Sequence, residues 1–505
     1  MRRARLLTVA AVLALAVTAC TSSDPEPGPT TSGPSATASP TAPDDGTTVV
    51  EVEHLGAPVE LTVHPLQVVG EHALLTVDYA MPQGAPAGTN LSVAALLRNP
   101  GTFLNVGRLR LLDTAGGQAW EVGRDGGVSI STSGEPLNLA PGGSVTSEAF
   151  FAAPDTDRVD VLFPYFGLVE DVPVVRDEDV ATTPEDLGAS AAAVYPTGGV
   201  EVFTLAYDGG ASTQVQAQEA TVTLASDVLF ATDVFELTPE AAAVVDNAAA
   251  QIKQAAQAGE VVVVGHTDDV GTDDYNLDLS NKRAASVAAR LGPALGAGFT
   301  LRTEGRGETE PVAPGTSAEA RAANRRVEVR FTAVEAGQAI EVTTGAAAVP
   351  EATGPVASGS TPVEVEVQGA TWSVTAQEVR RRGPYLVGTL RLERVSSGMG
   401  APVGLFGDFA SGRLLSRGLS STTLTAGAYG ATLLGEGSRF FPADYLNGNA
   451  GLDDARGVLA DQFIDVPLSE GQAVTVHAVW PDTGGDAVSI DAEGRFRITD
   501  VPVER

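Results

Sequence analysis

The sequence predicts a multidomain protein in which a central α+β domain lies between two β-sandwich domains. The chain has 505 residues, which is enough for about three domains of ordinary size. Short runs of alternating polar and apolar residues, broken by turn residues, fill 49–175 and 362–505 and indicate antiparallel sandwiches. Residues 218–333 instead alternate strand-like and helix-like patterns. Linkers are expected at 176–217 and 334–361, the first with one strand at 200–207.

The composition argues against several functional classes. The chain has 31 Lys and Arg against 64 Asp and Glu, a formal net charge of −33, and no basic stretch offsets it. This charge balance argues against nucleic acid as a partner. A single cysteine, Cys20, excludes an intramolecular disulfide and a cysteine-based metal cluster, and no two histidines have HxxxH spacing. We therefore expect no metal and no cofactor.

Residues 1–20 have the pattern of an export signal. Three arginines precede an apolar stretch at 6–17, which is too short for a transmembrane helix of about 20 residues. The sequence Val-Thr-Ala-Cys at 17–20 resembles the lipobox of bacterial lipoproteins, in which the cysteine is diacylated and becomes the mature N-terminus. The resemblance implies lipid attachment at Cys20 and a membrane anchor. The alternative is an ordinary secretory signal with an incidental cysteine.

Residues 21–48 form a predicted linker. They are rich in Pro, Ser, Thr and Gly and show no apolar periodicity. A Pro-rich chain of this length would reach about 90 Å when extended. We expect it to separate the anchor from the first β-sandwich.

The two predicted β-sandwiches share sequence landmarks. Val-Glu-Val-Glu followed by Gly-Ala occurs at 50–57 and again at 363–370, and Asp-Val-Pro-Val occurs at 171–174 and 500–503. The distance in sequence between matching landmarks of the two regions is 313 residues at the first landmark and 329 at the last. This predicts an internal repeat in which the second copy has about 16 extra residues, placed within 419–461. The alternative is two unrelated sandwiches. In either case the sequence does not identify their partner.

The central domain at 218–333 is predicted to have the order βαβαβ in two layers. Thr238 is a suitable N-cap for the first helix because Pro239 follows it. The other helices are expected at 275–291 and 318–325. The strands are expected at 220–224, 227–230, 260–265, 300–304 and 327–332.

Three motifs in this domain resemble the OmpA-like C-terminal domain family. Residues 265–271 read Gly-His-Thr-Asp-Asp-Val-Gly, residues 276–284 contain Asn-x-x-Leu-Ser-x-x-Arg-Ala, and residues 324–328 read Asn-Arg-Arg-Val-Glu. Each motif alone is weak, but their combination at this spacing is specific, and the resemblance covers about 115 residues. The family includes peptidoglycan-associated lipoproteins and flagellar stator proteins.

The resemblance implies non-covalent binding of peptidoglycan through the diaminopimelate of its stem peptide. Helical spacing puts Asn276 and Arg283 on one face, so Arg283 is expected above the loop that carries Asp268. Asp268 would bind the ammonium group and Arg283 the carboxylate of this zwitterion. By the same analogy Thr267 and Asn276 shape the pocket and Arg325 lies beside it. Two or three such contacts imply micromolar to millimolar monovalent affinity.

The charged residues of this site have alternative explanations, and one position departs from the family pattern. Asp268 and Arg283 could instead form a purely structural ion pair. The acidic residues of 268–278 lack the register of a calcium loop and are expected to form a solvated rim. Family members often have an Asp directly after the aromatic residue of the first strand, but here Ala231 takes that place. Either Asp233 replaces it, or one ligand contact is missing.

The sequence therefore favours a lipid-anchored envelope protein that tethers a membrane to the cell wall and is not an enzyme. The anchor would lie in the outer membrane of a diderm bacterium, or on the outer face of the cytoplasmic membrane of a monoderm. The alternative is an envelope adhesin or assembly scaffold whose β-sandwiches bind a protein or glycan. A wall hydrolase would need an acid and base pair or a metal site, and the sequence shows neither.

Overall fold

The computed structural model describes most of the chain after residue 45. The described residues are 46–86, 89–98, 105–133, 137–176, 180–335, 337, 339–344, 348–407, 414, 417, 419, 421–447 and 456–505. The predicted export signal with Cys20 and the linker up to residue 45 lie outside the described residues. Residues 40–505 belong to one compact unit.

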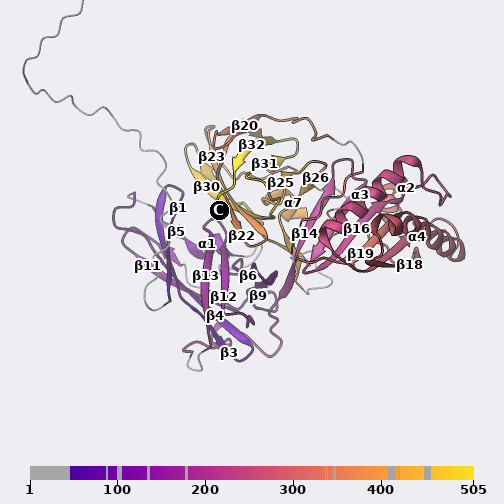
Figure 1. Cartoon of the computed structure of the whole chain (residues 1–505). Coiled ribbons are helices and arrows are strands. Elements are labelled where there is room, and N and C mark those ends of the chain that lie inside the picture. Colours follow the sequence, from indigo (N-terminus) through magenta and orange to yellow (C-terminus); the bar gives the residue numbers. More distant parts are fainter. Residues whose placement is uncertain are drawn as a thin grey trace, which may run out of the picture. The chain divides into compact units, whose positions relative to one another are not determined.

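The N-terminal β region consists of two sets of antiparallel strands, which also pair with each other (Figure 1). In one set β1, β2, β4 and β11 pair in that order, and β3 pairs with β4. In the other set β7, β6, β12 and β13 pair in that order, and β13 joins β3 in parallel. The bounds are β1 (Thr48–His54), β2 (Ala57–Val63), β3 (Leu66–Val69), β4 (His72–Ala80), β6 (Arg110–Asp113), β7 (Gln118–Glu121), β11 (Ser144–Ala152), β12 (Arg158–Phe163) and β13 (Gly167–Arg176).

The C-terminal β region has the same two sets of strands. Strands β21, β22, β23 and β30 pair in that order, and β26, β25, β31 and β32 pair in that order. The bounds are β21 (Val363–Val367), β22 (Ala370–Arg382), β23 (Tyr385–Arg394), β25 (Ala431–Leu434), β26 (Ser438–Phe440), β30 (Ala473–Pro481), β31 (Ala487–Ala492) and β32 (Phe496–Pro502).

The strand registers show that the two β regions repeat one topology. His72 pairs with Ala152 between β4 and β11, and Tyr385 pairs with Pro481 between β23 and β30, at the offsets of 313 and 329 expected from the sequence. The register of β12 on β13 is interrupted after Val159, and that of β31 on β32 is interrupted at the matching place. Equal registers over this many strands support the internal repeat.

The first hairpin of each repeat turns in the same way. Leu55 and Gly56 have φ of 53° and 78°, and Gln368 and Gly369 have φ of 52° and 76°. Two consecutive left-handed residues make the type I′ turn that matches the twist of a two-residue hairpin, and glycine adopts this conformation without strain. The shared Gly-Ala landmark of the two copies thus marks a shared turn.

The two β regions do not have separate cores. One hydrophobic cluster contains Leu61 and Phe151 from the first region together with Trp372 and Trp480 from the second. The expectation of two separate sandwich domains is therefore not confirmed. Apolar side chains of both repeats are buried against each other in one shared core, so neither repeat needs a complete hydrophobic core of its own.

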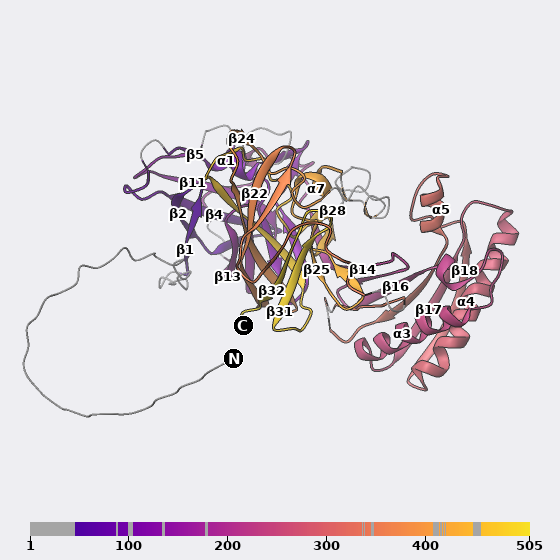
Figure 2. The same ribbon diagram turned by 90° about the horizontal axis from the view of Figure 1, so that it is seen from above.

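The central domain forms a four-stranded sheet in the order β18, β17, β19, β16, with β17 and β18 parallel and the other pairs antiparallel. Helices α3 and α4 pack on one face of it (Figures 1 and 2). The bounds are β16 (Glu219–Ala225), α2 (Ser226–Leu229), α3 (Pro239–Ala255), β17 (Gly259–His266), α4 (Asp273–Leu295), β18 (Phe299–Gly307), α5 (Ala318–Asn324) and β19 (Arg326–Thr332).

Local signals explain most of these elements. The Thr238 hydroxyl accepts a hydrogen bond from the N–H of Ala241 and caps α3, as expected. Gly265 lets α4 approach β17, because a Cβ there would collide with the carbonyl of Ser280. The strand expected at 227–230 is instead the single helical turn α2, whose first N–H donates to the carbonyl of Arg325. The element order is thus βααβαβαβ rather than βαβαβ.

The segment 176–217, expected to be a linker, contributes two strands to this sheet. Strand β15 (Ala211–Gln216) pairs with β16, and β14 (Thr197–Ala206) pairs with β15. Further along, β14 also pairs with β7 of the first repeat and with β26 of the second. Burial of alternating apolar residues of β14, including Val200 and Val202, fixes the segment in place.

The remaining elements are short. No helix among the described residues is long and apolar enough to cross a membrane. The short elements are β5 (Leu91–Ser92), α1 (Val93–Leu97), β8 (Arg124–Asp125), β9 (Val128–Ser129), β10 (Asn138–Leu139), the 3₁₀ helix η1 (Glu185–Leu187), β20 (Val356–Ser358), β24 (Met399–Gly400), α7 (Ser421–Ala426), β27 (Asp444–Leu446), β28 (Arg456–Val458) and β29 (Leu468–Ser469).

Candidate functional site

The predicted binding residues come together where β17 ends and α4 begins. The loop after His266 carries Thr267 and Asp268, and Thr272 caps α4 by accepting from the N–H of Tyr275. Asn276 and Arg283 both lie on the buried face of α4. The expectation that these two residues share a helical face agrees with the structure.

Arg325 is the centre of an ion-pair cluster at this site. Its Nη1 lies 2.7 Å from Oδ2 of Asp268, and its Nε and Nη2 donate to the two carboxylate oxygens of Asp227 at 2.9 and 2.6 Å. The hydrogen bonds from Arg325 lower the pKa of Asp227, and those to Asp227 raise the pKa of Arg325. Asp227 and Arg325 are therefore both ionised at neutral pH, and Asp268 is held by its hydrogen bond from Arg325.

Arg283 has a different environment. Its Nε donates to the carbonyl of Val234 at 3.1 Å, and its guanidinium lies 5.2 Å from the centre of the Phe230 ring. Among the described residues it forms no ion pair, so the alternative of a structural pair with Asp268 does not hold. Burial lowers the pKa of Arg283, and the negative charge of Asp227 opposes this effect. A buried guanidinium without a carboxylate partner is a favourable site for an anionic group.

Asn276 and Thr267 border the same loop. The Asn276 amide donates to the backbone carbonyl of Asp268 at 3.3 Å and to Oε2 of Glu308 at 2.6 Å. The Thr267 hydroxyl is buried and has no hydrogen-bond partner within the described part of the chain. Asn276 thus fixes the loop, whereas Thr267 leaves one polar atom available.

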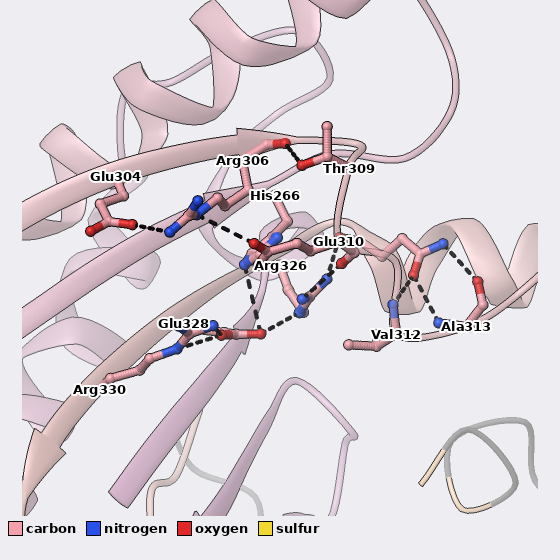
Figure 3. A network of polar contacts seen from close by, with 11 residues as sticks. His266, Glu304, Arg306, Thr309, Glu310, Val312, Ala313, Arg326, Glu328 and Arg330 are labelled. Carbon is pink, nitrogen blue, oxygen red and sulfur yellow. Dashed lines mark hydrogen bonds and ion pairs between the residues drawn. The ribbon is translucent and has the colours of Figure 1, made fainter. Parts of the chain in front are cut away.

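The motif at 324–328 ties the loops around the site together (Figure 3). The Asn324 side chain accepts from the N–H groups of Val312 and Ala313 at 2.9 and 3.0 Å and donates to the Ala313 carbonyl at 2.9 Å. These bonds hold the segment after β18 against the end of α5. The residue after Asn324 is Arg325, so the same bonds position its guanidinium.

A second part of this network connects the end of β17 with β19 (Figure 3). The Arg326 Nε donates to Oε1 of Glu328 at 2.7 Å, and Nε2 of His266 lies 3.7 Å from the same oxygen. Burial by itself raises the pKa of Glu328, but the nearby His266 and the positive charge of Arg326 outweigh it and hold the pKa well below its usual range. Glu328 is therefore a carboxylate that supports the strand end before Thr267.

Asp233 occupies the region where the family pattern departs. Its φ is 57°, a left-handed conformation, and its Oδ1 accepts from the Tyr275 hydroxyl at 3.1 Å. The hydrogen bond to Asp233 raises the pKa of Tyr275. The negative charge of Asp233 also acts on Arg283. Asp233 thus brings a carboxylate near the predicted clamp. Ala231, which takes the place of the family Asp, has no carboxylate.

Sequence reasoning missed two groups of the site. Asp227 was expected in a strand, yet it forms two hydrogen bonds with Arg325, which is 98 residues later. Glu308 binds Asn276 from the loop after β18. No local pattern marks Asp227. Glu308 belongs to the sequence Gly-Arg-Gly-Glu at 305–308, which continues the family resemblance, but its partner Asn276 comes from a distant part of the chain. No group of three or more potential metal ligands occurs among the described residues.

Comparison with known proteins identifies the protein family of this chain. The model of the OmpA family matches residues 229–325. Residues of this chain are 35% identical over 145 positions to the peptidoglycan-associated lipoprotein of Pseudomonas putida, covering 29% of this chain and 83% of that protein. The chain belongs to the OmpA family.

Other relatives match over a smaller part of their length. The outer membrane protein A of Bordetella avium is 38% identical over 122 residues, which cover 23% of this chain and 62% of that protein. The outer membrane porin F of Pseudomonas aeruginosa is 41% identical over 108 residues, which cover 21% of this chain and 31% of that protein. The chain thus spans less than two thirds of both relatives.

Solved structures also resemble part of this chain. The cell wall anchor of the T6SS from Pseudomonas aeruginosa has 35% identity and a TM-score of 0.23, with 25% of this chain and 88% of that chain covered. The peptidoglycan-associated lipoprotein from Burkholderia pseudomallei has 26% identity and a TM-score of 0.18, with 23% of this chain and 90% of that chain covered.

Proposed function

We propose that this chain is a lipid-anchored envelope protein that binds peptidoglycan non-covalently and tethers a membrane to the cell wall. Family membership and a relative named as a peptidoglycan-associated lipoprotein support the wall as the partner. The observation that carries the proposal is the buried guanidinium of Arg283, which has no carboxylate partner among the described residues. It lies close enough to Arg325, the residue that binds Asp268, for the charges of the two guanidinium groups to interact.

The ligand of this proposal is the diaminopimelate of a stem peptide. Its free end carries an ammonium and a carboxylate on one carbon, so it needs an anionic and a cationic group that face one small space. Arg283 supplies the cation. Asp268 supplies the anion: its Oδ2 binds Arg325 and its Oδ1 accepts from the N–H of Val270, and carboxylate oxygens have further lone pairs for an ammonium.

Arg325 and Thr267 act as supporting groups in this proposal. Because Arg325 is bound to two carboxylates, it holds Asp268 in one orientation before the ligand arrives, and such preorganisation lowers the entropy lost on binding. The free hydroxyl of Thr267 is available to a ligand carboxylate or amide. The negative charges of Asp227 and Asp233 act on Arg283 and favour its charged form.

Weak binding at one site is sufficient for a tether. Two or three charge-assisted contacts imply micromolar to millimolar affinity. A lipid on Cys20 would confine the chain to a membrane, and the wall offers many copies of the ligand. Both raise the effective concentration and allow modest contacts to hold membrane and wall together.

Co-sedimentation with isolated cell walls tests this function. We expect the purified chain to pellet with walls that contain diaminopimelate and to remain soluble with walls that contain lysine at that position. The Arg283→Gln variant should remain soluble with both. Arg290→Gln is the matched control, because Arg290 lies on the same helix and pairs with exposed Asp246. Equal sedimentation of Arg283→Gln and Arg290→Gln would contradict the proposed clamp.

A further inference from the structure

A polar groove lies on the face of the central sheet that α3 and α4 leave uncovered. Along β16, Val222 and Leu224 belong to the core beneath the helices, whereas Thr221 and Thr223 line the groove. The same alternation continues into the neighbouring strands, because successive side chains of a strand point to opposite faces. The volume of the groove is about 460 Å³, within the range of small-molecule sites.

The floor of the groove is a regular array of hydrogen-bonding groups. Ser212 of β15 pairs with Thr223 of β16, and Gln214 pairs with Thr221. On the other side of β16, Thr221 pairs with Arg330 of β19. The hydroxyls of Thr221 and Thr223 have no hydrogen-bond partner in the described part of the chain. The floor therefore presents uncharged donors and acceptors beside the charged side chains of Glu219, Arg326, Glu328 and Arg330.

Arg417 forms one wall of the groove and holds free donors. Its side chain is only 9% exposed and its guanidinium lies 3.9 Å from the centre of the Phe203 ring. Its Nη2 donates to Asp444 and Glu201, but its buried Nε and Nη1 have no partner within the described residues. Buried donors without partners are rare in proteins because their desolvation is not compensated. A ligand oxygen in the groove would satisfy them.

The groove adjoins the proposed clamp through Arg325. Arg325 lines the groove, and its Nη1 also binds the Asp268 carboxylate. In peptidoglycan the diaminopimelate is the third residue of a peptide attached to the muramyl sugar. Two intervening residues span roughly 7 Å when extended, so the sugar must lie close to a bound diaminopimelate.

We propose that this groove binds the glycan of the same peptidoglycan strand, as an N-acetylglucosaminyl–N-acetylmuramyl disaccharide. This rests on the proposed function, since it names the second part of that ligand. The hydroxyls and acetamido groups of the disaccharide suit a floor of threonine, serine and glutamine side chains, and their oxygens suit the free donors of Arg417. Strand β15, Phe203 and Arg417 lie outside residues 229–325, the part of the chain that the family model matches.

Calorimetric titration of the full chain tests the proposal with three soluble probes. They are the free L-Ala–D-Glu–diaminopimelate tripeptide, the same tripeptide on the disaccharide, and the disaccharide alone. We expect the wild type to bind the disaccharide-tripeptide about 10-fold more tightly than the free tripeptide, which corresponds to one or two added neutral hydrogen bonds. The variant Thr221→Val/Thr223→Val should lose this gain and keep its affinity for the free tripeptide.

The control variant is Thr300→Val/Thr303→Val, which changes two exposed threonines of β18 away from the groove and should bind like the wild type. Equal wild-type affinities for the two peptide probes would overturn the glycan site and leave the clamp intact. Binding of the disaccharide probes without binding of the free tripeptide would support the groove and overturn the clamp. Binding of none of the three would overturn both. A loss of free-tripeptide affinity in Thr221→Val/Thr223→Val would assign these residues a structural role and reject the glycan site.

Discussion

Replacing Arg283 by glutamine separates ligand binding from folding. Among the described residues the guanidinium makes one hydrogen bond, to the Val234 carbonyl, and one ring contact, with Phe230. Glutamine removes the positive charge and keeps a side chain able to donate a hydrogen bond. The substitution therefore deletes the group proposed to bind the ligand carboxylate and leaves every ion pair among the described residues in place.

The expected magnitudes differ for the two properties. The lost hydrogen bond and ring contact are each worth about 1 kcal/mol, and removal of a buried charge without a carboxylate partner offsets part of that. We expect the free energy of unfolding to change by no more than about 1 kcal/mol. A charge-assisted contact to a ligand carboxylate is worth about 1.5–3 kcal/mol, so affinity should fall roughly 10- to 150-fold.

Titration calorimetry with a diaminopimelate-containing tripeptide measures the affinity, and urea unfolding measures the stability. Arg290→Gln on the same helix should leave affinity unchanged, since its partner Asp246 is exposed and outside the site. If Arg283→Gln bound the tripeptide as tightly as Arg290→Gln, the assignment of the carboxylate site to Arg283 would be refuted. A loss of affinity with an equal loss of stability would assign Arg283 a structural role instead.

Three further predictions follow from other parts of the chain. Arg325→Gln leaves Asp227 and Asp268 without their cation and should lower the free energy of unfolding by about 1–2 kcal/mol in urea titrations; an unchanged value would show that this cluster does not stabilise the domain. Burial lowers the pKa of His54 to about 4, although the charge of Asp461 opposes this shift. The native state therefore binds fewer protons than the unfolded state between pH 4 and 6.5. Stability should thus fall by about 3 kcal/mol as pH drops through this window, and His54→Phe should remove that part of the pH dependence in unfolding curves recorded from pH 4 to 7.5; identical curves would contradict it. Cys20→Ser should move the protein from the membrane to the soluble fraction of the producing cells, and retention in the membrane would argue against a lipid anchor.

Much of the central domain could be predicted from local sequence. Thr238 and Pro239 mark the start of α3, and the apolar run at 260–265 forms β17, because capping and apolar periodicity act over a few residues. The spacing of Asn276 and Arg283 on one helix also placed both on the buried face of α4. The turns and registers of the two β regions likewise agree with the repeat expected from short landmarks.

Other features depend on contacts between distant segments. The sequence did not show that Arg325 binds Asp227 as well as Asp268, because which carboxylates meet one guanidinium is decided by how α2, β17 and α5 pack. The strand expected at 200–207 overlaps β14, but β15 appeared as part of a polar linker, because its alternate residues Ser212 and Gln214 line a groove that exists only in the folded sheet.

The sequence by itself determined the motif set, the helix starts, the repeat and the family of the central domain, since each depends on residues close together in the chain. Only the tertiary structure decided that the two β repeats share one hydrophobic cluster and that β14 joins both of them to the central sheet. The physical reason is that apolar burial is non-directional: it favours any partner surface that excludes water, and the fold as a whole selects which surface that is.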